Sequence, residues 1–331
     1  MRILVTGAAG FIGSHLVNRL VHEGHEVGAL VRYSSSGRRG WLDHIDEDIK
    51  DGFECIFGDV RDVEGIDAAV AGCDAIMNLA ALISIPYSYH AARSYVDTNI
   101  TGTLNLLHAA RRNDVSRFIQ TSTREVYGTA QRIPMDENHP LVGQSPYSAT
   151  KIASDELALS FHRSFDLPVV TLRPFNTYGP RQSTRAVIPT VIAQLVGGNR
   201  SIRLGSLAPT RDFNYVQDTV SGFVAALEPV ACIGETINLG TGHEVSIADM
   251  VKTVATIMMQ DVDIEEEQQR LRPRNSEVER LVADNTKAKQ LLGWAPQYGG
   301  KDGFERGIAE TVAWFREPAN IAQYDTSQYR V

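Results

Sequence analysis

The 331-residue sequence contains only three cysteines, and their positions offer no support for a cross-linked fold. Cys55, Cys73 and Cys232 are odd in number, far apart and without a CxxC pair. Neither a disulfide framework nor a zinc site is therefore expected, and we predict no bound metal. The remaining interpretation is that they are buried free thiols in a reducing compartment.

Long hydrophobic runs are also missing. No stretch reaches the roughly 18 consecutive apolar residues that a membrane-spanning helix needs. The N-terminal segment MRILVTGAAGFIGSHLV is apolar, but three glycines and His15 interrupt it too often for the hydrophobic part of a signal peptide. The sequence therefore predicts a cytoplasmic protein with no membrane partner.

An excess of positive charge is absent as well. The chain has 32 Lys and Arg residues against 40 Asp and Glu residues, which gives a formal net charge of −8. Because phosphate neutralisation requires a basic face, this balance argues against a general nucleic-acid-binding protein. A local basic pocket for one anionic ligand remains possible. The composition, 43% hydrophobic and 22% charged, is that of an ordinary globular protein.

Short apolar segments that alternate with helical patterns predict an α/β fold with a doubly wound parallel sheet. Arg2–Thr6 is rich in Ile, Leu and Val and stops at glycine, as a buried parallel strand does. Apolar residues recur at helical spacing over Phe11–His22, and Glu26–Val31 is a second strand, which completes a βαβ unit. The alternation continues with strands at 54–57, 75–79, 117–120 and 169–173 and with clear helices at 98–111 and 147–165.

The glycine-rich loop GAAGFIG lies between the first strand and the first helix. Gly7, Gly10 and Gly13 permit a tight turn and let the backbone approach a pyrophosphate. The helix N-terminus at Phe11 and Ile12 is then free to hold the negative charge. A glycine triplet alone is weak evidence, but its place directly after a strand predicts a Rossmann-type dinucleotide-binding fold.

The end of the second strand bears on the choice between NAD and NADP. An acidic residue usually binds the adenosine ribose of NAD there, but this chain has Val31 and Arg32 in ALVRYSSSGRR. A carboxylate would repel a 2′-phosphate, whereas Arg32 with Ser34 and Ser35 can bind one. NADP is therefore favoured, with NAD less expected. The alternative is a solvated basic loop beside bound NAD.

The regular alternation loosens after about residue 175. Loops at 176–186 and 205–214 follow, and 261–280 is a charged stretch. We therefore expect a dinucleotide-binding domain at 1–175 and a smaller substrate-binding lobe at 176–331. A segment near 212–240 is expected to return to the first sheet, through Thr236–Leu239.

Tyr147 and Lys151 stand four residues apart in SPYSATK, at the start of a predicted helix, so their side chains share one face. A phenol with a pKa of about 10 is a poor base at neutral pH, but an adjacent ammonium and an oxidised nicotinamide both favour the phenolate. The pair can then take a proton from a sugar hydroxyl as hydride leaves its carbon. YxxxK alone is a common pattern, and it becomes informative after the glycine loop and TSTREVYG.

With these motifs the chain resembles the extended short-chain dehydrogenase/reductase family of sugar-nucleotide epimerases and dehydratases. The resemblance covers essentially all 331 residues, in the order VTGAAGFIGSH, GDVRD, NLAA, DTNITGTLNLL, STREVYG, YSATK, RPFNTYGPRQ and RDFNYVQD. VRYSSS is similar to the corresponding stretch of GDP-mannose 4,6-dehydratases, which use NADP. ISIPYSYHAARSYVDTN, QSPYSATK and SEVERLVADNTKAKQLLGW are most similar to N-acetylglucosamine nucleotide 4,6-dehydratases of legionaminic-acid pathways.

The resemblance implies further cofactor-binding positions. Asp59 of FGDVRD borders the adenine, and Asn99 supports the pair of Tyr147 and Lys151. The other positions that contact the cofactor are Val60, Leu79, Ala80 and Ala81.

The resemblance also implies roles within TSTREVYG. The hydroxyl of Thr123 orients the sugar O4, and Glu125 removes the C5 proton once C4 is a ketone, after which water leaves from C6. Epimerases lack this glutamate, so Glu125 favours elimination. Arg124 departs from the family pattern, in which Asp or Ser stands at this position, and a guanidinium cannot act as an acid. Either Glu125 moves the proton itself, or the elimination ends differently, or Arg124 points elsewhere, for example to a surface acid.

Substrate binding is expected to use the second lobe. Asn176, Arg211 and Arg272 match the family's phosphate-binding positions, and Arg274 is the alternative to Arg272 because the spacing is uncertain there. A bidentate guanidinium suits a phosphate. Tyr87, with Tyr89 and His90, lies in a loop that reaches the sugar or packs against the protein.

The expected function is NADP-dependent 4,6-dehydration of a nucleotide-diphosphate hexose such as UDP- or GDP-N-acetylglucosamine. Alternatives are a 5,6-dehydratase that leaves an alkene, a C4 epimerase or decarboxylase, and a nucleotide-sensing protein without activity. The helices at 98–111 and 147–165 are long and apolar enough to form a homodimer interface.

Overall fold

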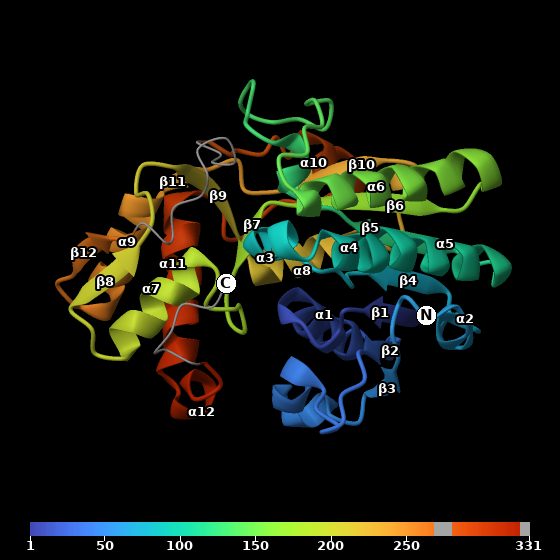
Figure 1. Ribbon diagram of the computed structural model, residues 1–331, viewed down its shortest axis with the longest axis horizontal. Coiled ribbons are helices and arrows are strands. Elements are labelled where there is room, and N and C mark those ends of the chain that lie inside the picture. Colours follow the sequence, from blue (N-terminus) through green and yellow to red (C-terminus); the bar gives the residue numbers. More distant parts are fainter. Residues whose placement is uncertain (268–279, 325–331) are drawn as a thin grey trace.

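A seven-stranded parallel sheet forms the centre of the protein (Figure 1). The computed structural model describes residues 1–267 and 280–324. The strands lie in the order β10 (Thr236–Leu239), β6 (Val169–Pro174), β5 (Arg117–Thr121), β4 (Ala75–Asn78), β1 (Arg2–Thr6), β2 (Glu26–Val31) and β3 (Phe53–Phe57). The chain runs outward from β1 to one edge and then from β4 to the other, which confirms the predicted doubly wound fold.

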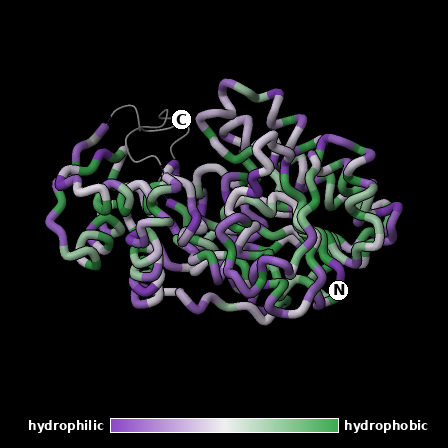
Figure 2. The backbone as a smooth tube through the Cα atoms, turned by 90° about the horizontal axis from the view of Figure 1, so that it is seen from below, coloured by the Kyte–Doolittle hydropathy of each residue, from purple (hydrophilic) through white to green (hydrophobic). Residues whose placement is uncertain are grey.

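Side chains of the central strands alternate between two buried layers. Along β1, Ile3 and Val5 belong to one hydrophobic cluster and Leu4 belongs to another, and all three are fully buried. A strand that is covered on both faces needs apolar residues at successive positions, which explains this uninterrupted run. Figure 2 shows the hydrophobic segments gathered within the sheet region and hydrophilic residues toward the outside.

Helices cover both faces of the sheet. On one face α1 (Phe11–His22) contacts α8 (Val216–Ala225), and on the other α5 (Gly102–Arg112) packs between α2 (Val63–Val70) and α6 (Pro146–Phe165). The start of α6 is sharply defined, because Ser145 caps the helix and Ser148 bonds back to the Ser145 backbone. Because the cap fixes the first turn of α6, it also fixes the positions of Tyr147 in that turn and of Lys151 one turn later.

The predicted helix at 98–111 differs from the structure at its start. The chain is helical from α3 (Ile85–His90) through α4 (Ala92–Tyr95), but Val96–Thr101 forms a π-helical turn, and α5 begins only at Gly102. Apolar spacing does not distinguish α- from π-type hydrogen bonding, so the sequence pattern could not reveal this turn. Such turns are frequent at functional sites.

The second part of the chain lies at the carboxyl ends of the central strands (Figure 1). Strand β10 pairs with β6 and so brings the chain back to the first sheet, while the division at residue 175 stays a prediction. Among the described residues, no helix is both long and apolar enough to span a membrane. The remaining elements are β7 (Asn176–Tyr178), β8 (Ser201–Leu204), β9 (Thr210–Tyr215), β11 (Glu244–Ser246), β12 (Asp263–Glu266), α7 (Val187–Val196), α9 (Ile247–Met258), α10 (Thr286–Leu292), α11 (Gly300–Arg316) and α12 (Pro318–Ile321).

Candidate active site

The glycine loop between β1 and α1 has no room for side chains. Gly7 has a φ of 68°, and a Cβ there would lie 2.8 Å from the backbone carbon of Leu79. A Cβ on Gly13 would lie 2.3 Å from the Gly7 carbonyl oxygen. Gly10 precedes α1, whose first residues Phe11 and Ile12 are not capped by a side chain. This loop therefore fits the pyrophosphate cradle of a dinucleotide, as predicted from the motif.

The loop after β4 lies directly beside the glycine loop. The Thr6 hydroxyl accepts hydrogen bonds from the backbone N–H groups of Leu79 at 3.1 Å and Ala80 at 3.0 Å, and it donates to Asn78 at 2.8 Å. The predicted cofactor residues Leu79, Ala80 and Ala81 are thus held next to Gly7. Neither Thr6 nor Asn78 was predicted from the sequence. Both adjoin recognised motifs, and both have polar side chains that can form such hydrogen bonds.

Asn99, in the π-helical turn, connects the loop after β4 with α6. Its side chain accepts from the backbone N–H of Leu82 at 2.8 Å and donates to Thr150 at 3.0 Å. Thr150 lies between Tyr147 and Lys151 on α6. The geometry therefore agrees with a supporting role for Asn99.

The ends of β2 and β3 carry the charged residues predicted for the adenosine end. Arg32 and Ser35 are exposed, and the Ser34 hydroxyl accepts from the Arg38 backbone N–H at 3.2 Å. The pKa of Asp59 is lowered, chiefly by hydrogen bonding to Arg61 and to a smaller extent by the charge of Arg32.

Val60 is buried next to this end of the sheet. An open pocket of about 510 Å³ adjoins it and is lined by Asp59, Arg61, Asp62, Arg93, Asp97 and Thr101.

Tyr147 and Lys151 are both buried at the start of α6. Burial raises the pKa of Tyr147 well above its usual value, and a hydrogen bond with Thr123 acts in the opposite direction. Burial lowers the pKa of Lys151, whose Nζ donates to the Thr121 carbonyl. The protein alone therefore does not favour the phenolate that the sequence analysis expected.

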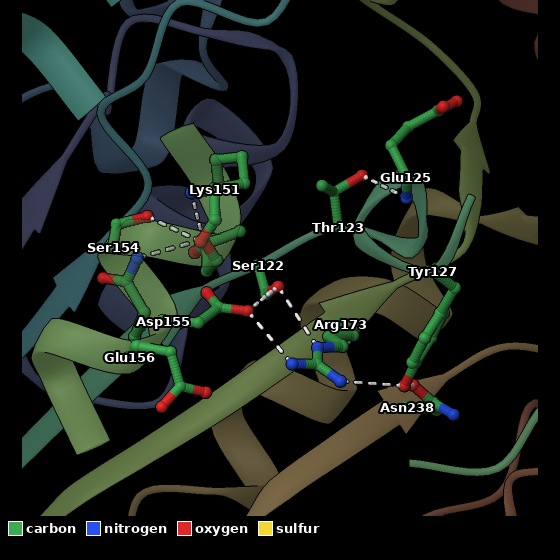
Figure 3. Close-up of polar contacts among 12 residues, drawn as sticks. Ser122, Thr123, Glu125, Tyr127, Lys151, Ser154, Asp155, Glu156, Arg173 and Asn238 are labelled. Carbon is green, nitrogen blue, oxygen red and sulfur yellow. Dashed lines mark hydrogen bonds and ion pairs between the residues drawn. The ribbon is translucent and has the colours of Figure 1, made fainter. Parts of the chain in front are cut away.

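Thr123 and Glu125 lie where β5 ends and a 3₁₀ turn, Arg124–Tyr127, begins. The Thr123 hydroxyl caps this turn by accepting from the Glu125 backbone N–H at 3.3 Å. A hydrogen bond with Thr123 and the charges of Glu125 and Arg124 all act on the pKa of Tyr147, so the predicted base lies within electrostatic reach of the phenol. Figure 3 shows the Thr123 hydroxyl beside the Glu125 backbone nitrogen, with the Glu125 carboxylate extended away from the turn.

Arg124 points toward the candidate base. Its Nη1 lies 2.7 Å from Glu125 Oε1, and the two side chains are only 13% and 12% exposed. Of the alternatives left open by the sequence, pairing with a surface acid is therefore wrong. Arg124 and Glu125 form a largely buried ion pair.

The predicted substrate residues fall into three groups. Tyr87 is 46% exposed, and its ring lies 6.2 Å from that of buried Tyr95, which in turn lies 6.3 Å from Tyr147. Asn176 donates to the Asp212 carbonyl at 3.3 Å and pairs with Phe213 on β9, the strand that also carries Arg211 two residues before Phe213. Arg272 and Arg274 lie outside the described residues.

Tyr95 was missed by the sequence analysis, because no motif marks it. Its hydroxyl donates to the Ser84 carbonyl, so its ring is fixed between Tyr87, which lies on helix α3 and not in the predicted loop, and the candidate catalytic Tyr147. Tyr89 and His90 are exposed on the same short helix, α3.

The fold, the glycine cradle and the buried tyrosine and lysine define a class, the extended short-chain dehydrogenases/reductases. The family model for GDP-mannose 4,6-dehydratase matches residues 4–309, and the chain belongs to this family of sugar-nucleotide dehydratases and epimerases. The resemblance inferred from the motifs is thereby confirmed.

Known proteins match over nearly the whole chain. The low-salt glycan biosynthesis protein Agl12 of Haloferax volcanii is 36% identical, covering 92% of this chain and 96% of its own. The UDP-glucose 4-epimerase of Mycolicibacterium smegmatis is also 36% identical, with coverages of 96% and 99%. The crystal structure of a DesIV double mutant, a dTDP-glucose 4,6-dehydratase from Streptomyces venezuelae with NAD and DAU bound, is 31% identical, with a TM-score of 0.84 and coverages of 96% and 98%.

Proposed function

We propose that the protein is a sugar-nucleotide 4,6-dehydratase that converts a nucleotide-diphosphate hexose to its 4-keto-6-deoxy product. The observation that carries this proposal is the carboxylate of Glu125, which shares one site with Tyr147 and Thr123. A C4 epimerase needs no such base, because inversion at C4 does not break the C5–H bond.

Residues of the first domain support binding of a nicotinamide dinucleotide. The cradle around Gly7 and Gly13 would be filled by any Cβ, which fits a group that must approach the backbone closely. When bound, the nicotinamide accepts hydride from C4 and later returns it to C6. Arg32 and Ser34 make NADP our proposal, although the related structure of DesIV holds NAD.

Two residues of the chain, Tyr147 and Glu125, would carry out the proton transfers of the reaction. Thr123 orients the sugar O4, and Tyr147 takes its proton while Lys151 supplies positive charge nearby. The resulting C4 ketone acidifies the C5–H bond, and Glu125 removes that proton. Loss of the C6 hydroxyl as water then requires one proton at that oxygen. Return of hydride to C6 requires one proton at C5, and the proton that Tyr147 took from O4 balances this step.

Arg124 limits where that proton can come from. A guanidinium stays protonated and cannot act as the acid. We infer that Arg124 holds the Glu125 carboxylate in place and that Glu125 itself passes the proton from C5 to the departing hydroxyl. The 2.7 Å ion pair supports this arrangement, because the Arg124 guanidinium lies directly beside the Glu125 carboxylate.

The substrate is proposed to be UDP- or GDP-N-acetylglucosamine, held through its diphosphate by the second lobe. Asn176 and Arg211 lie on neighbouring strands, β7 and β9, and Arg272 or Arg274 is proposed to complete this group. Tyr87 is proposed to contact the sugar. The helices at 98–111 and 147–165 are proposed to form a homodimer interface, and the exposed side chain of Phe165 at the end of α6 supports this.

Product analysis tests the proposal. The protein is incubated with UDP- and GDP-N-acetylglucosamine, with dTDP-glucose for comparison, and the products are identified by mass and NMR. Loss of water with a new ketone and a C6 methyl group is the expected result. Loss of water with an alkene and no ketone indicates 5,6-dehydration, loss of CO₂ indicates decarboxylation, and an unchanged mass indicates epimerisation or no reaction.

Two variants separate the chemical roles. Glu125→Gln should still reduce the cofactor in the presence of substrate but release no dehydrated product. Tyr147→Phe should bind cofactor and reduce none of it. Unchanged turnover in Tyr147→Phe would contradict the mechanism, and cofactor binding without any reduction by the native protein would favour a nucleotide-sensing protein.

A further inference from the structure

A buried group of charges lies directly behind the candidate site (Figure 3). Asp155 is fully buried on α6, four residues after Lys151, so the two side chains share a face of the helix. Its Oδ2 accepts a hydrogen bond from Ser122 and lies 3.3 Å from Nη2 of Arg173 on β6. Among the described residues, Asp155 Oδ1 has no hydrogen-bond partner.

Arg173 extends this group to the far end of the TSTREVYG loop. Its Nη1 donates to the Tyr127 hydroxyl at 3.1 Å, and its Nε donates to the Ser122 hydroxyl at 3.3 Å. Tyr127 in turn donates to Asn238 on β10 at 2.7 Å. Ser122 immediately precedes Thr123, and Tyr127 follows Glu125 by two residues, so the network holds the loop on both sides of the candidate base.

The same network contributes charge to the site. Asp155 raises the pKa of the buried Lys151, whose own burial lowers it, and the charge of Asp155 also acts on Tyr147. Glu125 and Arg124 also act on Tyr147 through their charges, and the phenol ring of Tyr95 lies 6.3 Å from its ring. Arg173 is the cation that faces Asp155 from β6.

We propose that Asp155 and Arg173 are positioning residues for the reaction: their ion pair fastens the loop that carries Thr123 and Glu125 to the helix that carries Tyr147 and Lys151. Asp155 also shares a face of α6 with the buried Lys151 and acts on it through its charge. This inference rests on the proposed function, because it assigns the network to the Tyr147 and Glu125 chemistry.

Buried ion pairs also affect folding, so the variants must separate the two effects. Removing one partner leaves the other charge buried and alone, whereas replacing both by apolar residues often leaves stability unchanged or improved. The test therefore compares Asp155→Asn with the double variant Asp155→Leu/Arg173→Met. Glu156→Gln is the matched control, because Glu156 is the next residue on α6 and its side chain is 53% exposed.

The experiment measures thermal unfolding and the pH dependence of cofactor reduction in a single turnover with the sugar nucleotide. For a positioning role, the double variant should unfold at or above the temperature of Asp155→Asn and yet reduce cofactor at least about tenfold more slowly than the native protein. In Asp155→Asn both limbs of the pH profile should move to lower pH, since loss of a negative charge makes Lys151 and Tyr147 lose their protons more readily. In the double variant the removal of the Arg173 cation opposes this shift. The control should match the native protein in every measurement.

The outcomes distinguish this inference from the function on which it rests. A double variant that is stably folded and keeps the native rate and pH profile would overturn the positioning role and leave the proposed function intact. A rate loss that equals the unfolded fraction, with an unchanged pH profile, would also overturn it. If the native protein reduces no cofactor with any sugar nucleotide tested, the proposed function itself fails, and the inference fails with it.

Discussion

Replacing Arg124 by Gln tests the least expected feature of the site. The substitution removes the guanidinium that lies 2.7 Å from Glu125 in a pair whose side chains are 13% and 12% exposed. A hydrogen bond to a charged group contributes about 1.5–3 kcal/mol. If this contribution is lost from the transition state for C5 proton removal, the rate should fall roughly 10- to 150-fold.

The assay follows the two halves of the reaction separately. Cofactor reduction reports on the oxidation at C4 and should change little in Arg124→Gln, whereas release of dehydrated product should fall by the full factor. Arg124→Lys should recover part of the rate, because it restores the charge without the planar fork.

A second ion pair in the same region provides the control. Arg132 pairs with Asp136 at 2.7 Å, but the two side chains are 52% and 38% exposed. Exposed pairs contribute little, so Arg132→Gln should leave both rates at the native level. Arg124→Gln with native dehydration, or with equal losses in both half-reactions, would refute a role for Arg124 that is specific to Glu125.

Three further predictions concern the cofactor and stability. Gly13→Ala should weaken cofactor binding at least about tenfold in a fluorescence titration, because the new Cβ would lie 2.3 Å from the Gly7 carbonyl oxygen, a backbone atom that cannot yield without moving the loop. Arg32→Ala should lower the affinity for NADP more than that for NAD; an equal loss would contradict 2′-phosphate recognition. Burial lowers the pKa of His15 from 6.5 to about 4. As the pH drops from 6.5 to 4, the imidazole of the unfolded chain takes up a proton that the folded protein does not bind, so the free energy of unfolding falls. The loss should approach about 3 kcal/mol in denaturant unfolding and be absent in His15→Gln.

Local patterns predicted the parts of the molecule that depend on adjacent residues. Three such features are the run Ile3–Val5, the glycine loop after it and the spacing of Tyr147 and Lys151. Each depends only on residues close to it in the sequence, and each lies in the structure where the sequence predicted it. The π-helical turn at Val96–Thr101 was missed, because its hydrogen-bond register leaves no mark on apolar spacing.

Contacts between distant segments could not be predicted in the same way. The partner of Arg124 depends on how the 3₁₀ turn after β5 orients two consecutive side chains, so the sequence left three possibilities open. The network around Asp155 draws its residues from three separate segments: Ser122 and Tyr127 from the loop after β5, Arg173 from β6 and Asn238 from β10. None of these residues is unusual in its own segment, and only the fold brings them together.

The groups around Tyr147 determine whether its phenol keeps its proton. Burial raises the pKa of the phenol, and the nearby carboxylates of Glu125 and Asp155 raise it further, against the hydrogen bond from Thr123 and the charge of Arg124. The protein's own charges and the burial therefore favour the phenol over the phenolate, and a cationic nicotinamide bound nearby would lower the pKa of Tyr147. Since each carboxylate is already paired with an arginine, the site can receive that positive charge without either carboxylate being drawn away from its position.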